Sequence, residues 1–272
     1  MSAAPDLATR PGTPPAPGQP PGWRHDFEVL FDRVRARSFS RGGLVATVVQ
    51  PLLFYAIFYC TFAGMLDERG IGFGRFVTAT VLVQALMFVA IGSATELSAD
   101  RTSGVFARLL TSPVDMRAMS LAHLAVVALQ GLLCTVVITL TGHLAGFRFD
   151  RGALAALGFV VVAVAFAVAL SLATATIALR IGNAEALSAV LHLPYLPLLV
   201  LSTGFVEAGL FPGWLQPIVA ASPVSGVIDT LRALSTAELT WSATLPGLAW
   251  LVGLIALFSW TTTAAFRKVA IR

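Results

Sequence analysis

The chain alternates between long apolar segments and short polar ones. About 20 apolar residues are needed for a helix to cross a bilayer, and six segments meet or approach that length. The pattern therefore predicts an all-α polytopic membrane protein with six transmembrane helices. The expected spans are residues 43–65, 76–97, 118–144, 154–179, 186–205 and 245–266.

The segment before the first span divides into two parts. Residues 1–22 are rich in Pro, Gly, Ala and Thr and predict a disordered tail. Residues 23–38 carry apolar side chains at helical spacing with charged residues largely on the other side, which predicts an amphipathic helix too polar to span. We expect this helix to lie at the cytoplasmic interface, either with a specific role or as a plain anchor. Its apolar positions are Phe27, Leu30, Phe31 and Val34.

The stretch between the fifth and sixth spans, about residues 207–234, is apolar but broken by proline and glycine. It is too interrupted for a span, so we expect a partly re-entrant hairpin at the outer face, with a short helix over 225–234. Asp229 and Arg232 are three residues apart on that helix and can pair with each other, the alternative being a contact with substrate. The other candidate residues of the outer hairpin are Pro212, Gly213 and Trp214.

Composition agrees with this class and limits what the chain can do. Hydrophobic residues make up 57% of the 272 residues, charged residues only 12%, and the mean hydropathy is +0.82. Soluble domains carry about 25% charged residues. Spans therefore fill the chain and leave no room for a soluble catalytic domain, so function must lie in the membrane or in a partner.

The distribution of lysine and arginine predicts the orientation. Thirteen of the 18 basic residues fall on the side that holds both termini. Because positive residues are enriched in cytoplasmic segments, both termini are expected in the cytoplasm. The arginines flank apolar spans, which favours contact with membrane lipid and argues against nucleic acid. The opposite side carries Arg69, Arg75, Arg148, Arg151 and Arg232.

A polar island, residues 96–114, interrupts the apolar pattern after the second span. It keeps an apolar stripe of Val105, Phe106, Leu109 and Leu110, with Thr102 or Ser103 as the expected N-cap of a helix and Pro113 as its end. A helix of this length suits a groove on another protein. The alternative is an ordinary cytoplasmic loop.

Motifs of catalysis and of nucleotide binding are missing from the sequence. There is no Gly-x-x-x-x-Gly-Lys-Ser/Thr, no His-Glu-x-x-His and no Gly-x-Ser-x-Gly. His123, His143 and His192 lie on different spans or at different ends of a span, and Cys60 and Cys134 fall in apolar segments. We therefore expect neither an enzyme nor a cofactor or metal site in this chain.

A transporter remains the best class, and its cavity should be apolar because the spans hold hardly any charge. An ion-coupled secondary transporter would need paired acidic residues at mid-membrane or internal repeats, and neither is evident. A hydrophobic or amphipathic cargo is therefore favoured. The candidate lining residues, for each of which plain packing is the alternative, are Phe54, Phe58, Gln84, Phe88 and Tyr195.

Two motifs give the chain a family resemblance. One runs from Asp100 to Pro113, Asp-Arg-Thr-Ser-Gly-Val-Phe-Ala-Arg-Leu-Leu-Thr-Ser-Pro, and the other comprises residues 201–204, 211–217, 222–225 and 229–234. Together they resemble type 2 ABC-exporter permeases, especially the daunorubicin/doxorubicin-resistance-like membrane subunits of actinobacteria. The resemblance covers nearly all of residues 23–272.

The resemblance implies that separate subunits bind ATP and form the path for cargo. About residues 100–111 would be a coupling helix that docks on an ABC ATP-binding subunit, which would hold ATP and Mg. A second permease chain, identical or related, would complete a cavity in the bacterial plasma membrane, and the cargo would be a drug-like compound or a complex lipid. The residues that match the coupling position are Arg101, Gly104, Arg108 and Pro113.

The island departs from the family pattern at two places. Family members commonly carry glutamate just before the glycine and before the second arginine, whereas this chain has Ser103 and Ala107. Docking is therefore expected to depend on Val105, Phe106 and Leu109 more than on acidic contacts.

Overall fold

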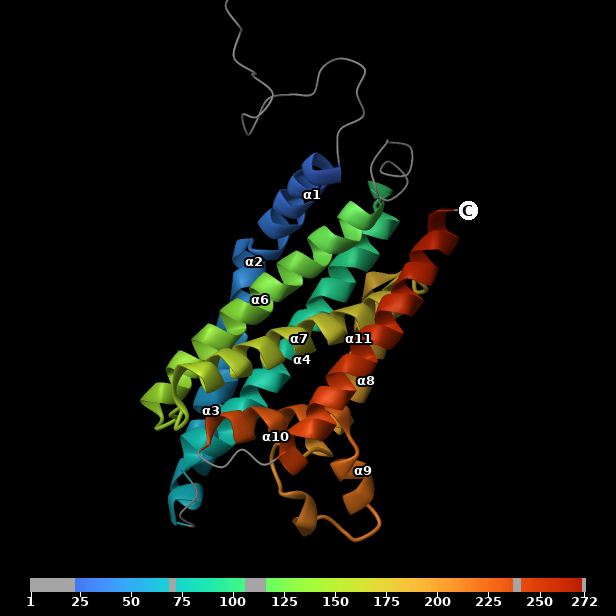
Figure 1. Cartoon of the computed structure of the whole chain (residues 1–272). Coiled ribbons are helices and arrows are strands. Elements are labelled where there is room, and N and C mark those ends of the chain that lie inside the picture. Colours follow the sequence, from blue (N-terminus) through green and yellow to red (C-terminus); the bar gives the residue numbers. More distant parts are fainter. Residues whose placement is uncertain (1–22, 69–71, 106–115, 237–240, 271–272) are drawn as a thin grey trace, which may run out of the picture.

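The computed structural model describes residues 23–68, 72–105, 116–236 and 241–270, and every regular element within these ranges is a helix (Figure 1). The long helices are α3 (Gln50–Glu68), α4 (Phe73–Thr102), α6 (Met116–Leu144), α7 (Gly152–Ala178), α8 (Ala184–Val200) and α11 (Trp241–Ala270). The remaining elements are α1 (Trp23–Ser38), α2 (Arg41–Leu44), the π-helix η1 (Val45–Val49), the 3₁₀ helix η2 (Ala208–Leu210), α9 (Gln216–Ala220) and α10 (Pro223–Ser235).

Five helical segments are long and apolar enough to cross a membrane: Gly42–Gly64, Phe73–Thr102, Arg117–Leu144, Gly152–Ala178 and Thr244–Thr262. The all-helical membrane class predicted from the sequence is confirmed by them. The remaining predicted span, residues 186–205, corresponds to α8, which has 17 residues and is shorter than these five segments.

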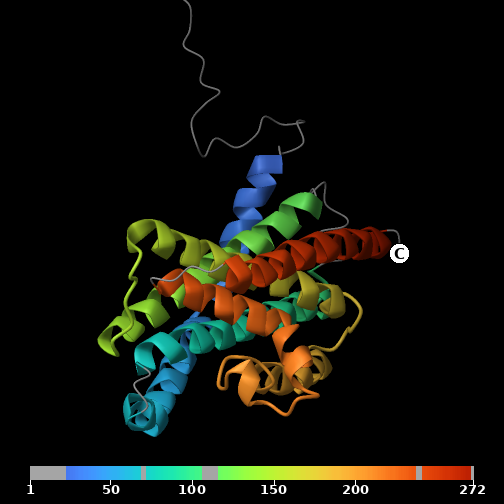
Figure 2. The same cartoon turned by 60° about the horizontal axis from the view of Figure 1, so that its bottom comes forward.

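Successive long helices run in alternate directions along a tilted bundle (Figure 1). One end, here called the α1 end, holds α1 and the carboxyl end of α11. The other, the α10 end, holds α10 across the bundle and the segment with α9 (Figure 2). Residues far apart in the sequence come into contact at each end, and these contacts form the polar sites described below.

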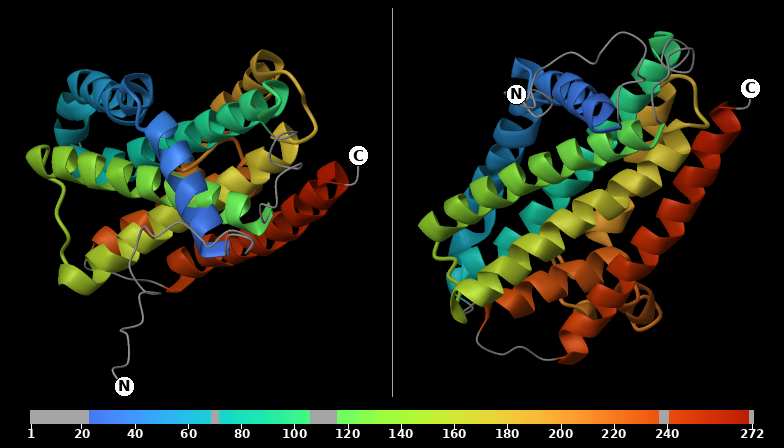
Figure 3. Two further views of the ribbon diagram at one scale, coloured as in Figure 1. Left: turned by 90° about the horizontal axis from the view of Figure 1, so that it is seen from above. Right: turned by 45° about the horizontal axis from the view of Figure 1, so that its top comes forward.

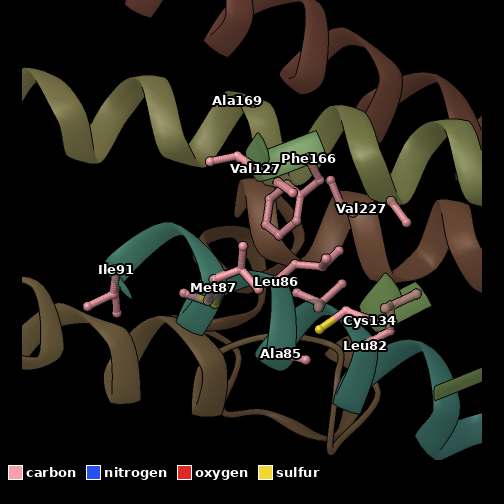
Figure 4. Close-up of a cluster of buried hydrophobic side chains, with 14 of the residues drawn as sticks. Leu82, Ala85, Leu86, Met87, Ile91, Val127, Cys134, Phe166, Ala169 and Val227 are labelled. Carbon is pink, nitrogen blue, oxygen red and sulfur yellow. The ribbon is translucent and has the colours of Figure 1, made fainter. Parts of the chain in front are cut away.

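α4 is the central helix of the bundle. Its apolar window is 83% buried, against 18% for the window that contains α3 and 17% for that of α11. Leu82 and Leu86 of α4 pack among side chains of the neighbouring helices, including Phe166 of α7 and Val227 of α10 (Figure 4). A displacement of α4 would therefore change the packing of most helices in the bundle.

The amphipathic pattern of residues 23–38 forms α1, as predicted. α1 lies across α6 at the end of the bundle (Figure 3). Leu30 is buried, and Phe27 and Phe31 pack against the core with their rings stacked 5.8 Å apart. The apolar face is thus covered by protein, and the arginines on the other face are exposed.

Candidate functional site

The last turn of α4 occupies the start of the predicted coupling segment. α4 continues through Thr102, and Gly104 follows with a φ of +74°. Glycine often ends helices in this left-handed conformation because it has no Cβ to clash. Thr102 is the last residue of α4, and Ser103 follows as its C-cap, with its hydroxyl donating to the Asp100 carbonyl. The helix for which Thr102 or Ser103 is the predicted N-cap lies largely outside the described residues.

The predicted coupling residues divide between described and undescribed parts of the chain. Arg101, Gly104 and Val105 are described, and Val105 is half-buried. The others, Phe106, Arg108, Leu109 and Pro113, lie outside the described residues.

Asp100 ties α4 to α1. Its Oδ1 lies 2.5 Å from Nη1 of Arg37 and 3.5 Å from Nη2 of Arg33. One turn earlier on α4, Oε2 of Glu96 accepts a hydrogen bond of 2.7 Å from the Ser38 hydroxyl. The carboxyl-terminal part of α1 is therefore joined to α4 at the start of the polar island.

The same end of α4 is also tied to the end of α7. Arg101 donates through Nη1 to the carbonyl of Leu179, the residue that caps α7. The Ser98 hydroxyl donates to the Ile181 carbonyl over 3.1 Å. An arginine beside the carboxyl end of a helix stabilises the carbonyl groups that lack a partner within the helix. Arg101, predicted as a docking residue, thus forms a hydrogen bond to another helix of the same chain.

We call these contacts the α4 junction. It joins three helices, α1, α4 and α7, at the point where the island begins. Its residues are Arg33, Arg37, Ser38, Glu96, Ser98, Asp100, Arg101, Leu179 and Ile181. Sequence reasoning missed most of them. The available signal was the spacing of Arg33 and Arg37, which are four residues apart and so share one face of a helix.

Replacing Asp100 with asparagine should loosen α1 without unfolding the chain. Both arginines are more than 40% exposed, so the ion pairs contribute only about 1 kcal/mol. We expect limited trypsin cleavage after Arg33 and Arg37 to become faster, on the order of fivefold. Asp32→Asn is the matched control, because Asp32 pairs within α1, with Arg35. Equal acceleration in the two variants would contradict a link between α1 and α4.

The predicted cavity residues gather mostly where α3, α4 and α8 meet. The rings of Phe54 and Phe88 stack at 6.3 Å, and Phe88 lies 4.8 Å from Tyr195. Phe58 is displaced toward the α10 end and stacks on Phe205 at 5.2 Å. Gln84 is buried one turn from Phe88. The structure thus brings four of the five together along one seam.

A cavity of about 200 Å³, lined by both apolar and polar side chains, adjoins this seam on the side of the α1 end. Phe88 forms one wall, together with Val89 and Ile91 of the same helix. The polar lining consists of Thr47, Gln50, Ser93, Thr95, Glu96, Gln130, Ser188 and His192. Single polar residues on separate spans give a weak sequence signal, so only their arrangement in space identifies the cavity.

At the α10 end, Arg232 is the centre of a second polar site. Its Nη1 donates to the Thr203 carbonyl at 2.7 Å, and Nη2 donates to the Gly204 carbonyl at 2.8 Å and to the Phe76 carbonyl at 3.0 Å. The guanidinium also lies 4.1 Å from the centre of the Phe76 ring, a cation–π geometry. Arg232 therefore fastens residues 203–204 and α10 to the amino end of α4.

Asp229 completes this site. Its Oδ1 accepts a hydrogen bond of 2.8 Å from the Thr203 hydroxyl and lies 3.9 Å from Arg232 Nη1, so the predicted local pair is present. Burial raises the pKa of the Asp229 carboxyl, and Thr203 and Arg232 oppose that shift. Burial likewise lowers the pKa of Arg232 to about 10, against the effect of Asp229. Arg232 therefore remains charged at neutral pH.

The remaining outer residues are exposed. Pro212, Gly213 and Trp214 lie between η2 and α9, and the Trp214 side chain is 73% exposed. Tryptophan is enriched where membrane meets water, so this position suits an interfacial anchor. Gln216 closes the segment by donating to the Phe211 carbonyl at 2.9 Å.

The described part of the chain offers no group of three or more His, Cys, Asp or Glu side chains that could hold a metal. His123 instead makes an interhelical contact, with Nε2 at 2.7 Å from the Ser93 hydroxyl. The polar groups thus tie helices together or line the cavity.

Known proteins resemble this chain over most of its length. Residues 25–236 match the family described as ABC-2 type transporter. The doxorubicin resistance ABC transporter permease protein DrrB of Mycobacterium tuberculosis is 30% identical over 254 residues, which cover 88% of each chain. The daunorubicin resistance ABC transporter permease protein DrrB1 of Streptomyces coeruleorubidus is 30% identical over 229 residues, which cover 84% of this chain and 78% of that protein. The protein therefore belongs to the ABC-2 type transporter family, among permease proteins of ABC transporters.

Proposed function

We propose that this protein is the membrane-spanning subunit of an ATP-driven exporter that moves a hydrophobic or amphipathic cargo, such as a drug-like compound or a complex lipid, out of the cytoplasm or inner leaflet. A separate subunit binds and hydrolyses ATP with Mg. Two permease chains, identical or related, enclose the path. The main support for this proposal is the α4 junction, because its contacts connect the start of the polar island to three helices, α1, α4 and α7.

In this proposal α8 is the fifth of six spans. A helix of 17 residues is about 25 Å long at 1.5 Å per residue, slightly less than the roughly 30 Å hydrocarbon core. Residues 201–205 continue it toward the α10 end. Six passes place both termini on one side, and the excess of arginine there makes it the cytoplasmic side of the bacterial cell membrane.

Force would pass from the ATP-binding subunit into the bundle through the α4 junction. The island begins within the last turns of α4, so a push on the island acts on the end of the most buried helix. Asp100 would transmit the movement to α1, and Arg101 would transmit it to α7. A rigid connection of this kind lets closure of the ATP-binding subunits tilt several helices together.

The main test of this mechanism compares an apolar residue of the island with a charged one. Phe106→Asp should weaken docking of the ATP-binding subunit by about 2 kcal/mol, roughly 30-fold, because it places a charge in an apolar contact. Arg108→Glu should cost less, about fivefold, since exposed charge pairs contribute little. The measurement is co-purification of the tagged permease with its ATP-binding partner in mild detergent, together with ATP-dependent export. A larger effect from Arg108→Glu would show that charge governs docking, and intact binding and export after deletion of residues 101–110 would refute the mechanism.

A further inference from the structure

A groove lies between α1 and α6 at the surface of the bundle. Its volume is about 640 Å³, within the range of about 300–1,000 Å³ that is usual for small-molecule sites. α1 crosses α6 here, and each helix supplies one wall (Figure 3). The groove shares no lining residue with the cavity beside α4. Its lining consists of Trp23, Arg24, Phe27 and Glu28 on α1 and of Leu121, Leu124 and Ala125 on α6.

The α6 wall lies in the first turns of a membrane span. That span begins at Arg117, and Leu121 follows one turn later. Leu121 is 50% exposed, and in a bilayer an exposed leucine near the start of a span meets acyl chains. Trp23, which lines the same groove, is 55% exposed, and tryptophan is enriched where membrane meets water. The groove therefore extends across the boundary between acyl chains and head groups.

The α1 wall combines aromatic and charged side chains. Trp23 and Phe27 are four residues apart, and so are Arg24 and Glu28, a spacing that puts each pair on one helical face. Arg24 and Glu28 are both exposed, and neither takes part in an ion pair within the described residues. The groove thus offers one positive and one negative group about 6 Å apart along the helix.

Other charged groups close to the groove do not line it. Asp26 lies on the same turn of α1 but is only 6% exposed, and Arg117 lies one turn before Leu121. In the carboxyl-terminal half of α1, the arginines of the described ion pairs contact Asp32 or Asp100. The charges of the lining are therefore one base and one acid.

This balance favours a ligand that carries both signs. A phosphate suits Arg24, because the planar guanidinium donates parallel hydrogen bonds to phosphate oxygens. An ammonium group with N–H donors suits the Glu28 carboxylate, which can only accept. A head group in which a short linker joins phosphate to ammonium satisfies both side chains. Its acyl chains then cover the exposed apolar surface of Leu121 and Leu124.

We propose that this groove holds a resident phospholipid of the phosphatidylethanolamine class, whose head group contains a primary ammonium. Its phosphate contacts Arg24, its ammonium contacts Glu28, and its upper acyl chains lie along Leu121 and Leu124. The lipid connects the amino-terminal half of α1 to α6, whereas Asp100 connects the carboxyl-terminal half to α4. This role goes beyond the exporter function and does not depend on it.

Native mass spectrometry of the full chain in dodecyl maltoside tests the head-group preference. The three lipids compared are phosphatidylethanolamine, phosphatidylcholine and phosphatidylglycerol with identical acyl chains. The unaltered chain should bind phosphatidylethanolamine about fivefold more tightly than either of the others. Choline has no N–H to donate to Glu28, and the glycerol head group carries no positive charge. Equal affinities, or a preference for phosphatidylglycerol, would overturn the proposal.

Two variants separate the contributions of the two charges. Glu28→Gln should remove the preference for phosphatidylethanolamine over phosphatidylglycerol. Arg24→Gln should weaken binding of both lipids by about fivefold, because both contain a phosphate. The matched controls are Asp32→Asn and Arg35→Gln, since these two residues lie on the same helix and pair with each other outside the groove. Losses of the same size in the controls would overturn the site.

A third pair of variants tests the location. Leu121→Trp should fill the groove and weaken binding of phosphatidylethanolamine by about fivefold or more. Leu140→Trp is the control, because Leu140 lies on the same helix, is 63% exposed and does not line the groove. Equal effects of the two variants would overturn the location. The lipid should also remain bound when the ATP-binding subunit is added, and its release would assign the groove to that subunit instead.

Discussion

Arg232→Met should destabilise the protein by about 3 kcal/mol, the cost of removing one partner from a buried, hydrogen-bonded charge pair. Methionine keeps much of the apolar stem but donates no hydrogen bond. The Thr203 and Gly204 carbonyls lose the guanidinium, and Asp229 is left without its cation. We expect the melting midpoint in detergent, followed by size-exclusion fluorescence, to fall by on the order of 10 °C.

The control for this prediction is another arginine at the same end of the bundle. Arg75 pairs with Asp150 at 3.1 Å, but its side chain is 50% exposed. Exposed ion pairs contribute about 1 kcal/mol or less, so Arg75→Met should lower the midpoint by only about 3 °C. If the two variants had the same melting midpoint, the hydrogen bonds of Arg232 would not stabilise this end of the bundle more than an exposed ion pair does.

The membrane class and most helix positions follow from the apolar pattern because each span must satisfy its backbone within one segment. Boundaries were less predictable. α4 begins at Phe73 and continues to Thr102, which is five residues past the predicted end at 97. The apolar pattern does not reveal these five extra residues of helix, because the last turn of α4 is polar and is stabilised by contacts with α1 and α7.

Site prediction succeeded for residues whose role depends on neighbours in the sequence and failed where the partners are distant. Asp229 and Arg232 share a helical face, so their pairing was predictable from spacing. The partners of Arg232 across the fold, such as the Phe76 carbonyl 156 residues away, were not. Backbone carbonyl acceptors carry no sequence signal, since every residue has one.

The cavity shows the same limit. Phe88 and Tyr195 were candidates because large aromatic side chains stand out in a span, but the acid beside them, Glu96, looked like the beginning of a cytoplasmic loop. The direction in which a residue near a helix end faces depends on the packing of that helix. The structure turns Glu96 toward a space that Gly92 leaves open.

Gly247→Ala should be among the most damaging small substitutions in the membrane region. A Cβ on Gly247 would clash with the Gly226 carbonyl and with the Thr230 hydroxyl, where α11 crosses α10. Small residues at such crossings allow backbones to approach closely in a membrane. The Thr230 hydroxyl donates to the Gly226 carbonyl at 2.7 Å within α10, and the Thr244 carbonyl of α11 lies 3.3 Å from the same hydroxyl across the contact.

We expect Gly247→Ala to cost about 3 kcal/mol, the upper range for overpacking, and to lower the melting midpoint by on the order of 10 °C. Gly253→Ala, six residues further along α11, should instead be neutral or stabilising by up to about 1 kcal/mol, because its Cβ enters open space and alanine favours helix. A second-site change of Thr230 to alanine should recover part of the Gly247→Ala loss, since it removes one of the clashing atoms. Equal stability of the two glycine variants would contradict the close crossing, and with it the way in which α10 and Arg232 are held against the last span.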